Sequence, residues 1–487
     1  MPSLKTKMHL VVLLEHADVL DTLMDQKMSL AVFCLLQTSK RIHDALNSTI
    51  LRLDLTRTKI VDLKPLVKMA SLTQLYLDRT EVEDTHWIGR LRQLTKLGLG
   101  RTWVDNLKPL AALTLLVELN LQGTMHVRNI EPLASLTSLR WLNLATTDVR
   151  VVSALSSLTS LTYLNVSETD TFDFTPLRKL VALTDLDLHG TKIDSSEIKA
   201  LKDLPLLTNL NLAATNELDI VHLEQHNVHL TCLDLSEASV SNAATLAKMT
   251  SLTKLRLKDT EIDELPPLGN LASLTHLDLC RTTFNGGPDL HDVTPLSELT
   301  SLTHLDLSAT SVADVRPLRK LTSLAHLDLC FTEIKDITVL SNLTSLTELD
   351  LSETHVDDVM PLSELTSLVK LILYNTGIVD VTPLATLTSL THLNLSDTHV
   401  DNVRPLKSMT SLVKLHLGRT KVVDVTPLAT LTSLLHLNLS DTRVENVRPL
   451  KSLTSLKRLD LKNSPCATGC RAYSQLENLR PTLKMRV

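Results

Sequence analysis

Leucine recurs through most of the chain in one fixed order of apolar and polar positions. The segment 321–329 (LTSLAHLDL) returns as 343–351 (LTSLTELDL) and as 387–395 (LTSLTHLNL). Most copies start 22 residues after the one before, and a fixed period of this length indicates stacked repeats that share one continuous core. The 19 repeats that we count begin at residues 47, 69, 91, 113, 136, 158, 180, 204, 227, 249, 271, 299, 321, 343, 365, 387, 409, 431 and 453.

Each repeat reads LTSLTxLxLSxTxVxDVxPLxx, and its parts predict two kinds of element. The Leu residues of TxLxL alternate with polar residues, as in a half-buried strand, and strands of successive repeats should stack in parallel about 4.8 Å apart. The Pro near the end of the repeat fixes φ and lacks an N–H, which favours an irregular or 3₁₀ return on the opposite side. We therefore predict an α/β repeat fold, a curved solenoid with a parallel sheet on its concave face.

The twelfth position of the repeat is Thr in 17 of the 19 repeats, from Thr58 to Thr442. We expect these hydroxyls to bond nearby backbone groups and to form a buried ladder. The repeat resembles the short 22-residue class of leucine-rich repeats, known from internalins and phosphatase regulators, which share the outline LTxLxxLxLxxNxIxDIxPL. Thr in place of the usual Asn and the monotonous LTSL segments look more like the leucine-rich-repeat proteins of trypanosomatids. The resemblance implies a leucine-rich-repeat solenoid that serves as a non-enzymatic protein-binding scaffold.

The repeats cover residues 47–464, and both ends of the chain break the pattern. Residues 465–487 begin with Pro465 and end in an alternating LKMRV segment, which predicts a short C-terminal cap with a closing strand. Residues 1–46 space their apolar residues as helices do, which predicts a helical N-terminal cap. Within them, residues 29–46 (SLAVFCLLQTSKRIHDAL) are similar to the second half of an F-box. That resemblance implies a second hypothesis, in which residues 1–46 bind the Skp adaptor and the chain is a substrate receptor of a ubiquitin ligase.

Composition narrows the functional classes. The chain has only 11 Gly in 487 residues and shows no P-loop, Gly-rich dinucleotide turn or nucleophile elbow, so we expect neither an enzyme nor a cofactor. A net charge of −6 argues against a nucleic-acid binder, and no stretch approaches the ~20 apolar residues of a membrane helix. Six scattered Cys favour a reducing compartment, and we expect a cytoplasmic or nuclear protein. A surface adhesin of the internalin type would need an export signal, for which the N-terminus gives weak support.

Two places on the expected concave face carry candidate partner-binding residues, and the first is aromatic. Position 6 of successive repeats places Trp141 beside Tyr163, and Tyr76 lies a few repeats away, in a chain with only 3 Trp, 4 Tyr and 5 Phe. Trp and Tyr are favoured hot-spot residues in protein interfaces. We therefore predict that these three residues bind a protein partner; the alternative is that large rings on a sheet simply pack on their neighbours.

The second place is a row of His beside a row of Asp. Three successive repeats carry His at position 6 and Asp at position 8, so in-register strands should stack like residues on like. His and Asp are metal-ligand types, but a recent duplication of one repeat explains the rows without a metal, and we predict a patch that faces a protein partner. Inert surface is the alternative. The residues are His276, Asp278, His304, Asp306, His326 and Asp328.

Overall fold

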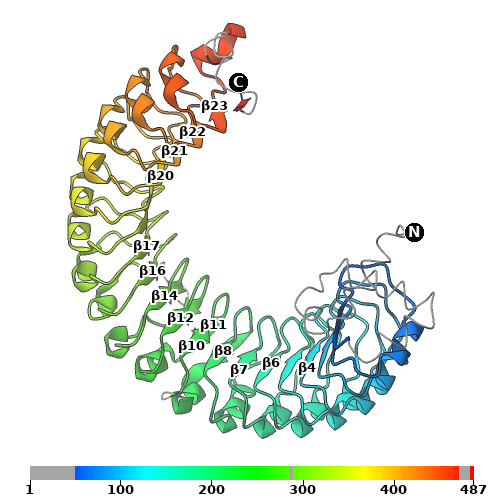
Figure 1. Cartoon of the computed structure of the whole chain (residues 1–487). Coiled ribbons are helices and arrows are strands. Elements are labelled where there is room, and N and C mark those ends of the chain that lie inside the picture. The colour runs from blue at the N-terminus through cyan, green and yellow to red at the C-terminus, as the bar shows by residue number, and fades with distance from the viewer. Residues whose placement is uncertain (1–49, 227–228, 285–288, 471–475, 477–482, 487) are drawn as a thin grey trace, which may run out of the picture. The chain divides into compact units, whose positions relative to one another are not determined.

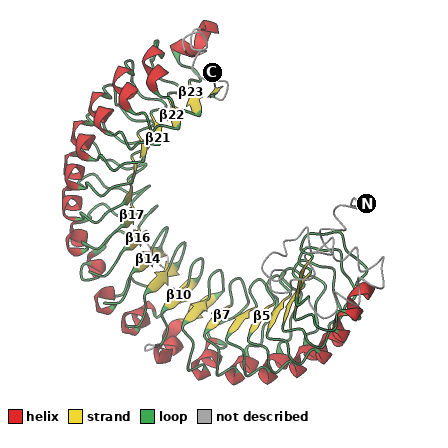
Figure 2. Ribbon diagram, viewed as in Figure 1, coloured by secondary structure: helices red, strands yellow, loops and turns green. Residues whose placement is uncertain are grey.

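In the computed structural model, the repeats stack in the order of the sequence. The structure describes residues 50–226, 229–284, 289–470, 476 and 483–486. Contacts divide the chain into two compact units, unit 1 up to Ser241 and unit 2 from Asn242 onward, and each is described by itself. Figure 1 labels several of the strands, and Figure 2 shows strands along the concave side of each unit and 3₁₀ helices along its outer side.

Unit 1 contains a parallel sheet to which each repeat adds one strand of three residues. Adjacent strands pair in register, so Leu75 lies opposite both Leu53 and Leu97. A second parallel pair forms between β9 (Glu217–Asp219) and β11 (Ser239–Ser241). The strands of the main sheet are β1 (Arg52–Asp54), β2 (Gln74–Tyr76), β3 (Lys96–Gly98), β4 (Glu118–Asn120), β5 (Trp141–Asn143), β6 (Tyr163–Asn165), β7 (Asp185–Asp187), β8 (Asn209–Asn211) and β10 (Cys232–Asp234).

Unit 2 is built in the same way. Its strands also pair in register, which places His304 opposite both His276 and His326. A second parallel pair forms between β13 (Glu261–Ile262) and β15 (Thr283–Phe284). The strands of the main sheet are β12 (Lys254–Arg256), β14 (His276–Asp278), β16 (His304–Asp306), β17 (His326–Asp328), β18 (Glu348–Asp350), β19 (Lys370–Ile372), β20 (His392–Asn394), β21 (Lys414–His416), β22 (His436–Asn438), β23 (Arg458–Asp460) and β24 (Lys484–Arg486).

The outer returns are 3₁₀ helices, most with Pro in the first turn. An Asp or Asn at position 16 of the repeat starts many of them; for example, Asp314 Oδ1 accepts the N–H of Arg316 at 2.9 Å. This bond satisfies a backbone donor that the short helix leaves open. Unit 1 contains η1 (Lys64–Lys68), η2 (Ile88–Arg90), η3 (Lys108–Ala112), η4 (Glu131–Ser135), η5 (Ser153–Ser157), η6 (Thr175–Lys179), η7 (Ile198–Asp203) and η8 (Ile220–His226). Unit 2 contains η9 (Ala243–Lys248), η10 (Leu268–Asn270), η11 (Thr294–Leu296), η12 (Arg316–Lys320), η13 (Thr338–Asn342), η14 (Met360–Glu364), η15 (Thr382–Thr386), η16 (Arg404–Ser408), η17 (Thr426–Thr430), η18 (Arg448–Ser452) and η19 (Pro465–Cys470).

The core lies between the strands and the outer returns, and it contains the Leu, Val and Ile residues of the repeat pattern. Leu327 on β17 is 2% exposed and Leu329 is fully buried. The Thr ladder is confirmed along the core edge: the Thr354 hydroxyl donates to the Leu351 carbonyl oxygen at 2.7 Å. Most other repeats form the same bond to the carbonyl three residues earlier, and the Thr282 hydroxyl also lies within bonding distance of the Leu257 carbonyl of the preceding repeat.

The residue before each ladder Thr has a left-handed backbone, which the sequence pattern does not reveal. At the non-glycine members of this position φ lies between 50° and 59°, as at Arg57 and Phe331. This conformation costs roughly 1–2 kcal/mol for an ordinary L residue. An inter-repeat bond holds it, because the N–H of Phe331 donates to the Ser352 carbonyl oxygen of the next repeat at 2.9 Å.

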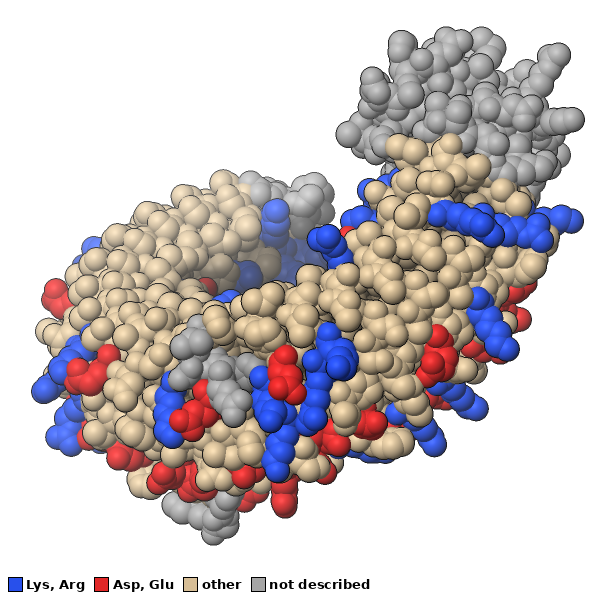
Figure 3. Space-filling model, turned by 90° about the horizontal axis from the view of Figure 1, so that it is seen from below, with Lys and Arg blue, Asp and Glu red and all other residues tan. Residues whose placement is uncertain are grey.

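Charged side chains of neighbouring repeats form ion pairs on the surface. Lys192 Nζ lies 2.7 Å from Asp170 Oδ1, and Arg419 Nη1 lies 3.3 Å from Asp397 Oδ1. On the face drawn in Figure 3, Lys and Arg side chains lie among Asp and Glu side chains. Such exposed ion pairs contribute little to the stability of the fold.

The ends of the chain differ in how far the structure describes them. Residues 1–46 lie outside the described residues, so the helical cap and its Skp-binding alternative stay predictions, as do the domain boundaries. At the other end, β24 pairs in parallel with β23, with Met485 opposite Leu459, as the alternating segment predicts. Cys466 in η19 is buried. Among the described residues, no helix is both long enough and apolar enough to cross a membrane.

Candidate partner-binding site

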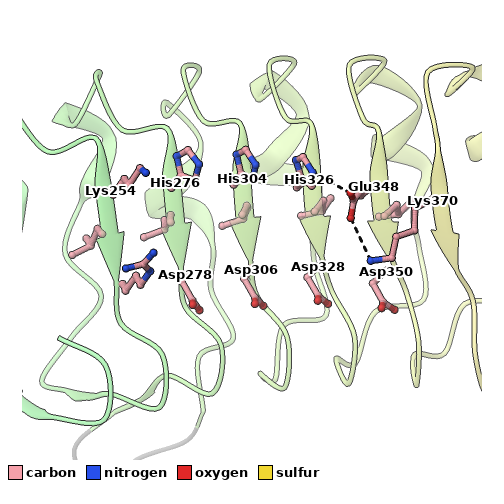
Figure 4. A pocket seen from close by; sticks show the side chains of 16 residues that line it. Lys254, His276, Asp278, His304, Asp306, His326, Asp328, Glu348, Asp350 and Lys370 are labelled. Atoms are coloured by element: carbon pink, nitrogen blue, oxygen red, sulfur yellow. Dashed lines mark hydrogen bonds and ion pairs between the residues drawn. The ribbon is translucent and has the colours of Figure 1, made fainter. Parts of the chain in front are cut away.

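Strands β12, β14 and β16–β19 form the floor of a shallow groove on the concave face of unit 2 (Figure 4). The groove has a volume of about 340 Å³. Each strand covers positions 6 to 8 of its repeat. Position 7 is a buried Leu, so the side chains at positions 6 and 8 lie on the surface of the sheet. Its polar lining consists of Lys254, Arg256, His276, Asp278, His304, Asp306, His326, Asp328, Glu348, Asp350 and Lys370.

The three predicted His residues form one stack of parallel rings. The ring centroids of His276 and His304 are 4.1 Å apart with an interplanar angle of 10°, and those of His304 and His326 are 4.2 Å apart at 9°. Figure 4 shows the three rings side by side, one per strand. The register of the sheet alone produces this stack, because each His occupies the same position in its repeat.

A Thr hydroxyl orients each of the first two rings. Thr275 Oγ1 lies 2.8 Å from His276 Nδ1, and Thr303 Oγ1 lies 2.9 Å from His304 Nδ1. Both Thr residues occupy position 5 of the repeat, directly before the His. With Nδ1 bound inside the protein, Nε2 is the ring nitrogen that each imidazole has left for a partner.

The third ring lacks that support. Ala325 occupies position 5 in this repeat, and Nδ1 of His326 is buried with no hydrogen-bond partner. Its Nε2 lies 3.4 Å from Glu348 Oε1, and Glu348 Oε2 lies 3.3 Å from Lys370 Nζ. A carboxylate only accepts hydrogen bonds, so Nε2 of His326 carries the hydrogen in this contact. A chain of polar contacts therefore closes one end of the stack.

The Asp row is partly used by the backbone, which sequence reasoning missed. Oδ1 of Asp278, Asp306 and Asp328 each accepts the N–H of the residue two positions on, at 3.0, 2.8 and 3.0 Å. These bonds end each strand in an Asp-bonded turn. The preference for Asp or Asn at position 8 was the available signal, because both side chains form such turns. One carboxylate oxygen of Asp278 and one of Asp306 remain for a partner, whereas the Asp328 carboxylate also bonds the Cys330 side chain.

Burial and neighbouring charges set the protonation of the two rows. Burial lowers the pKa of His276, and Lys254 and Arg256 lower it further. Burial also lowers the pKa of His304, followed by the charges of His276 and His326. Burial raises the pKa of the carboxyls of Asp278 and Asp328. Near neutral pH the lowered pKa keeps His276 and His304 neutral, and the raised pKa makes the carboxylates of Asp278 and Asp328 easier to protonate than free Asp.

The Cys residues beside the rows are not activated. Burial raises the pKa of the Cys280 and Cys330 thiols, and Asp328 adds to the effect at Cys330. A thiol with a raised pKa is a poor nucleophile because little thiolate forms. Within the described ranges, no group of three or more His, Cys, Asp or Glu side chains is arranged to hold a metal ion. The His and Asp rows stack parallel to each other instead of converging on a point (Figure 4).

Unit 1 brings together two of the three predicted aromatic residues. The rings of Trp141 on β5 and Tyr163 on β6 stack with centroids 5.0 Å apart and an interplanar angle of 10°. Burial raises the pKa of the Tyr163 hydroxyl. The neighbouring Asn143 and Asn165 are buried and bond the backbone two residues on, at 2.9 and 2.8 Å. The pair is therefore an ordered, uncharged surface.

Tyr76 does not join this pair. It lies on β2 at position 8 rather than position 6, and the Arg52 guanidinium lies 5.2 Å from the centre of its ring. Its hydroxyl bonds Gln74 Oε1 at 3.2 Å. The three aromatic residues therefore form two separate places, and a partner would need to span several strands to contact both.

The comparisons with known proteins fit the geometry of the sheet. No protein-family model matches the chain, and the search of curated proteins found no match. A leucine-rich-repeat protein of Leptospira interrogans has a similar fold, with a TM-score of 0.52 and 18% identity over 93% of this chain and 98% of that one. The plant peptide hormone receptor RGFR1, in complex with RGF2, has a TM-score of 0.53 and 17% identity over 88% of this chain and 84% of that one. An internalin of Listeria monocytogenes aligns with 21% identity over 90% of this chain and 95% of its own, at a TM-score of 0.39.

The fold is that of a leucine-rich-repeat solenoid, as the sequence pattern predicts. The finer resemblances to internalins, phosphatase regulators, trypanosomatid proteins and an F-box stay predictions. So does a cytoplasmic or nuclear location.

Proposed function

We propose that the chain is a non-enzymatic interaction scaffold that binds a protein partner on the concave side of its sheets. The observation that carries the proposal is the groove of unit 2, where three stacked imidazoles lie beside a row of half-buried carboxylates. The plant receptor with the same fold was solved in complex with RGF2, which supports the use of such a fold for binding.

Rigidity supports binding at this groove. The position-7 leucines below the groove are at most 2% exposed, and every strand is paired in register, so the polar side chains start from fixed positions. A surface ordered by folding loses little further entropy when a partner binds. The Nε2 atoms of His276 and His304 can then bond polar side chains of an extended segment. One oxygen of Asp278 and one of Asp306 can do the same.

The stacked pair of unit 1 supports a second contact. Trp and Tyr supply large contact areas that lose few rotatable bonds on binding, and they dominate measured hot spots. Because Trp141 and Tyr163 already stack on each other, their rings are ordered before a partner arrives.

Affinity purification of the full chain and of two triple variants tests the proposal. In the first variant His276, His304 and His326 are each replaced by Gln, which keeps a polar side chain but removes the stack. The matched control replaces His291, His355 and His399 by Gln as well. These three residues are exposed in unit 2 outside the row. We expect the first variant to lose at least one partner by about tenfold, a change of about 1.4 kcal/mol, and the control to lose none. Equal recovery of every partner by the wild type and both variants would contradict the role of the groove.

A further inference from the structure

A second groove on the concave side of unit 2 has a different chemistry. It lies on β21–β24 and has a volume of about 410 Å³. The register of these strands places His416, His436, Arg458, Lys484 and Arg486 on neighbouring strands. We call these five residues together with Asp460 the cationic groove. None of them belongs to the His/Asp groove described above.

The balance of charge in the cationic groove is strongly positive. Position 8, which is Asp on β14 and β16–β18, is Asn394 on β20, His416 on β21 and Asn438 on β22. Among the described residues that line the groove, the one carboxylate is Asp460, which lies 3.7 Å from Arg486 Nη1. Among the described residues, Arg458 and Lys484 form no ion pair, and both are exposed. Two cations on adjacent strands are therefore left for an anionic partner.

The residues of the groove that are not cationic limit the chemistry of that partner. Asn438 and Asp460 form the row beside Arg458 and Lys484, with Arg486 next to Asp460, so a strand of closely spaced phosphates would meet a carboxylate as well as the basic side chains. A peptide alternates charged side chains with neutral backbone, whose N–H groups can bond both residues. Strands β21–β24 span about 14 Å at a spacing of about 4.8 Å, which an extended peptide covers with about four residues.

We propose that the cationic groove binds an acidic peptide segment whose carboxylates pair with Arg458 and Lys484. The pairing is charge-assisted, and the guanidinium of Arg458 suits a carboxylate because it can form two parallel hydrogen bonds. The proposal goes beyond the scaffold function above, because it concerns other residues and names the chemistry of their partner.

The histidines of the groove make this binding sensitive to pH. Burial lowers the pKa of His416, and the charges of His436, Lys414 and His392 on its own and the flanking strands lower it further. Burial and the charges of Arg458, Lys414 and Lys457 likewise lower the pKa of His436. The facing residues at position 8 on both flanking strands, Asn394 and Asn438, are neutral. A bound carboxylate favours the charged imidazole, so binding takes up protons and strengthens as the pH falls.

Fluorescence anisotropy with the full chain tests the proposal. The probe is a fluorescein-labelled peptide of about six residues in which Glu alternates with Ser. We expect the double variant Arg458→Gln, Lys484→Gln to bind it about tenfold more weakly than the wild type. The control double variant Lys407→Gln, Lys451→Gln removes the same charge from the exposed outer helices η16 and η18 and should change the affinity by less than about twofold.

Further anisotropy measurements distinguish this proposal from binding at the His/Asp groove and from binding of a nucleic acid. The affinity of the wild type should rise between about pH 8 and about pH 6, and His416→Gln should reduce that rise. His276→Gln with His304→Gln should leave the affinity unchanged, so failure of the first groove and failure of this one are distinguishable. No binding of the Glu peptide, an equal loss in the control variant, or tighter binding of a single-stranded DNA of similar length would each overturn the proposal.

Discussion

The concave faces of unit 1 and unit 2 use one geometry for two chemistries. In unit 1, position 6 of adjacent strands holds Trp141 and Tyr163, whose ring centroids lie 5.0 Å apart. In unit 2, the same position holds three His rings with centroids 4.1 and 4.2 Å apart. The neighbouring position 8 holds Asn143 and Asn165 beside the aromatic pair of unit 1, and it holds Asp beside the His stack of unit 2. The repeat therefore fixes how side chains stack, and single substitutions decide whether the stack is neutral or able to titrate.

The largest effect that separates the two faces should come from the aromatic pair. Replacing both Trp141 and Tyr163 by Ala should weaken binding of a partner at unit 1 by more than ~2 kcal/mol, because a buried hot spot loses two large contact areas. Since the pair is uncharged, the loss should be the same at low and at high salt. Quantitative affinity purification at two salt concentrations measures both effects.

That experiment requires a control that shows the double variant to be folded. Both rings lie on the surface of the sheet above the buried Leu142 and Leu164, so the circular dichroism of the double variant should match the wild type. Unchanged recovery of every partner by a folded double variant would show that the pair only packs on itself.

How much the sequence predicts depends on which residues set the local structure. The leucines alone specify the strands, their parallel order and their register, so the stacks of His and of Trp141 with Tyr163 followed from counting positions. The left-handed residue before each ladder Thr did not follow, because Arg, Glu, Phe and Asp all occupy it. Its conformation is held by the next repeat rather than by its own side chain, as the bond from Phe331 to Ser352 shows.

The candidate site was predicted in position but not in detail. Sequence reasoning assigned these Asp residues only to a partner-facing patch, whereas one oxygen of each is bound by the backbone. It also treated the three His as equal. The difference between them lies in the preceding residue, Thr in two repeats and Ala325 in the third, and its effect appears only when the hydroxyl is seen to meet the ring.

That difference gives a second, smaller prediction within unit 2. Ala325→Thr should stabilise the protein by about 0.5–1.5 kcal/mol, because the new hydroxyl can donate to the buried Nδ1 of His326. Ala325 is half-buried, as Thr275 is at the same position of its repeat, so we expect the strand to accept the larger side chain. Equilibrium denaturation in urea measures the change. Thr303→Ala, which removes the matching bond from His304, should destabilise by a similar amount; if both variants unfold like the wild type, these hydroxyls do not support the rings.

The smallest effect, and the one that most sharply separates the two faces, is the dependence of stability on pH. His276 and His304 have a lowered pKa in the folded protein, first because of burial and then because of neighbouring positive charge. Between that lowered value and the unfolded value of about 6.5, the unfolded chain binds more protons than the folded one. The stability that these residues contribute is therefore fully present above about pH 6.5 and is lost as the pH falls through the folded pKa.

The acidic neighbours act in the opposite direction but at lower pH. The raised pKa of Asp278 and Asp328 means that the folded state binds protons before the unfolded chain does, so these groups add stability as the pH falls toward the ordinary Asp value. The pKa of a free carboxyl lies near 4, and the two effects separate if stability is measured from about pH 8 to about pH 5.5. Between pH 8 and pH 5.5 the histidines therefore dominate the dependence of stability on pH.

The double variant His276→Gln, His304→Gln removes the titration and keeps polar side chains on the strands. Its midpoint of thermal unfolding should fall less between pH 8 and pH 5.5 than that of the wild type. His399→Gln, an exposed His of unit 2 outside the row, should keep the wild-type profile. The aromatic pair of unit 1 contains no group that titrates near neutral pH, so the double variant Trp141→Ala, Tyr163→Ala should also keep it. Parallel profiles for the wild type and the His double variant would mean that the His stack of unit 2 is as indifferent to pH as the aromatic stack of unit 1.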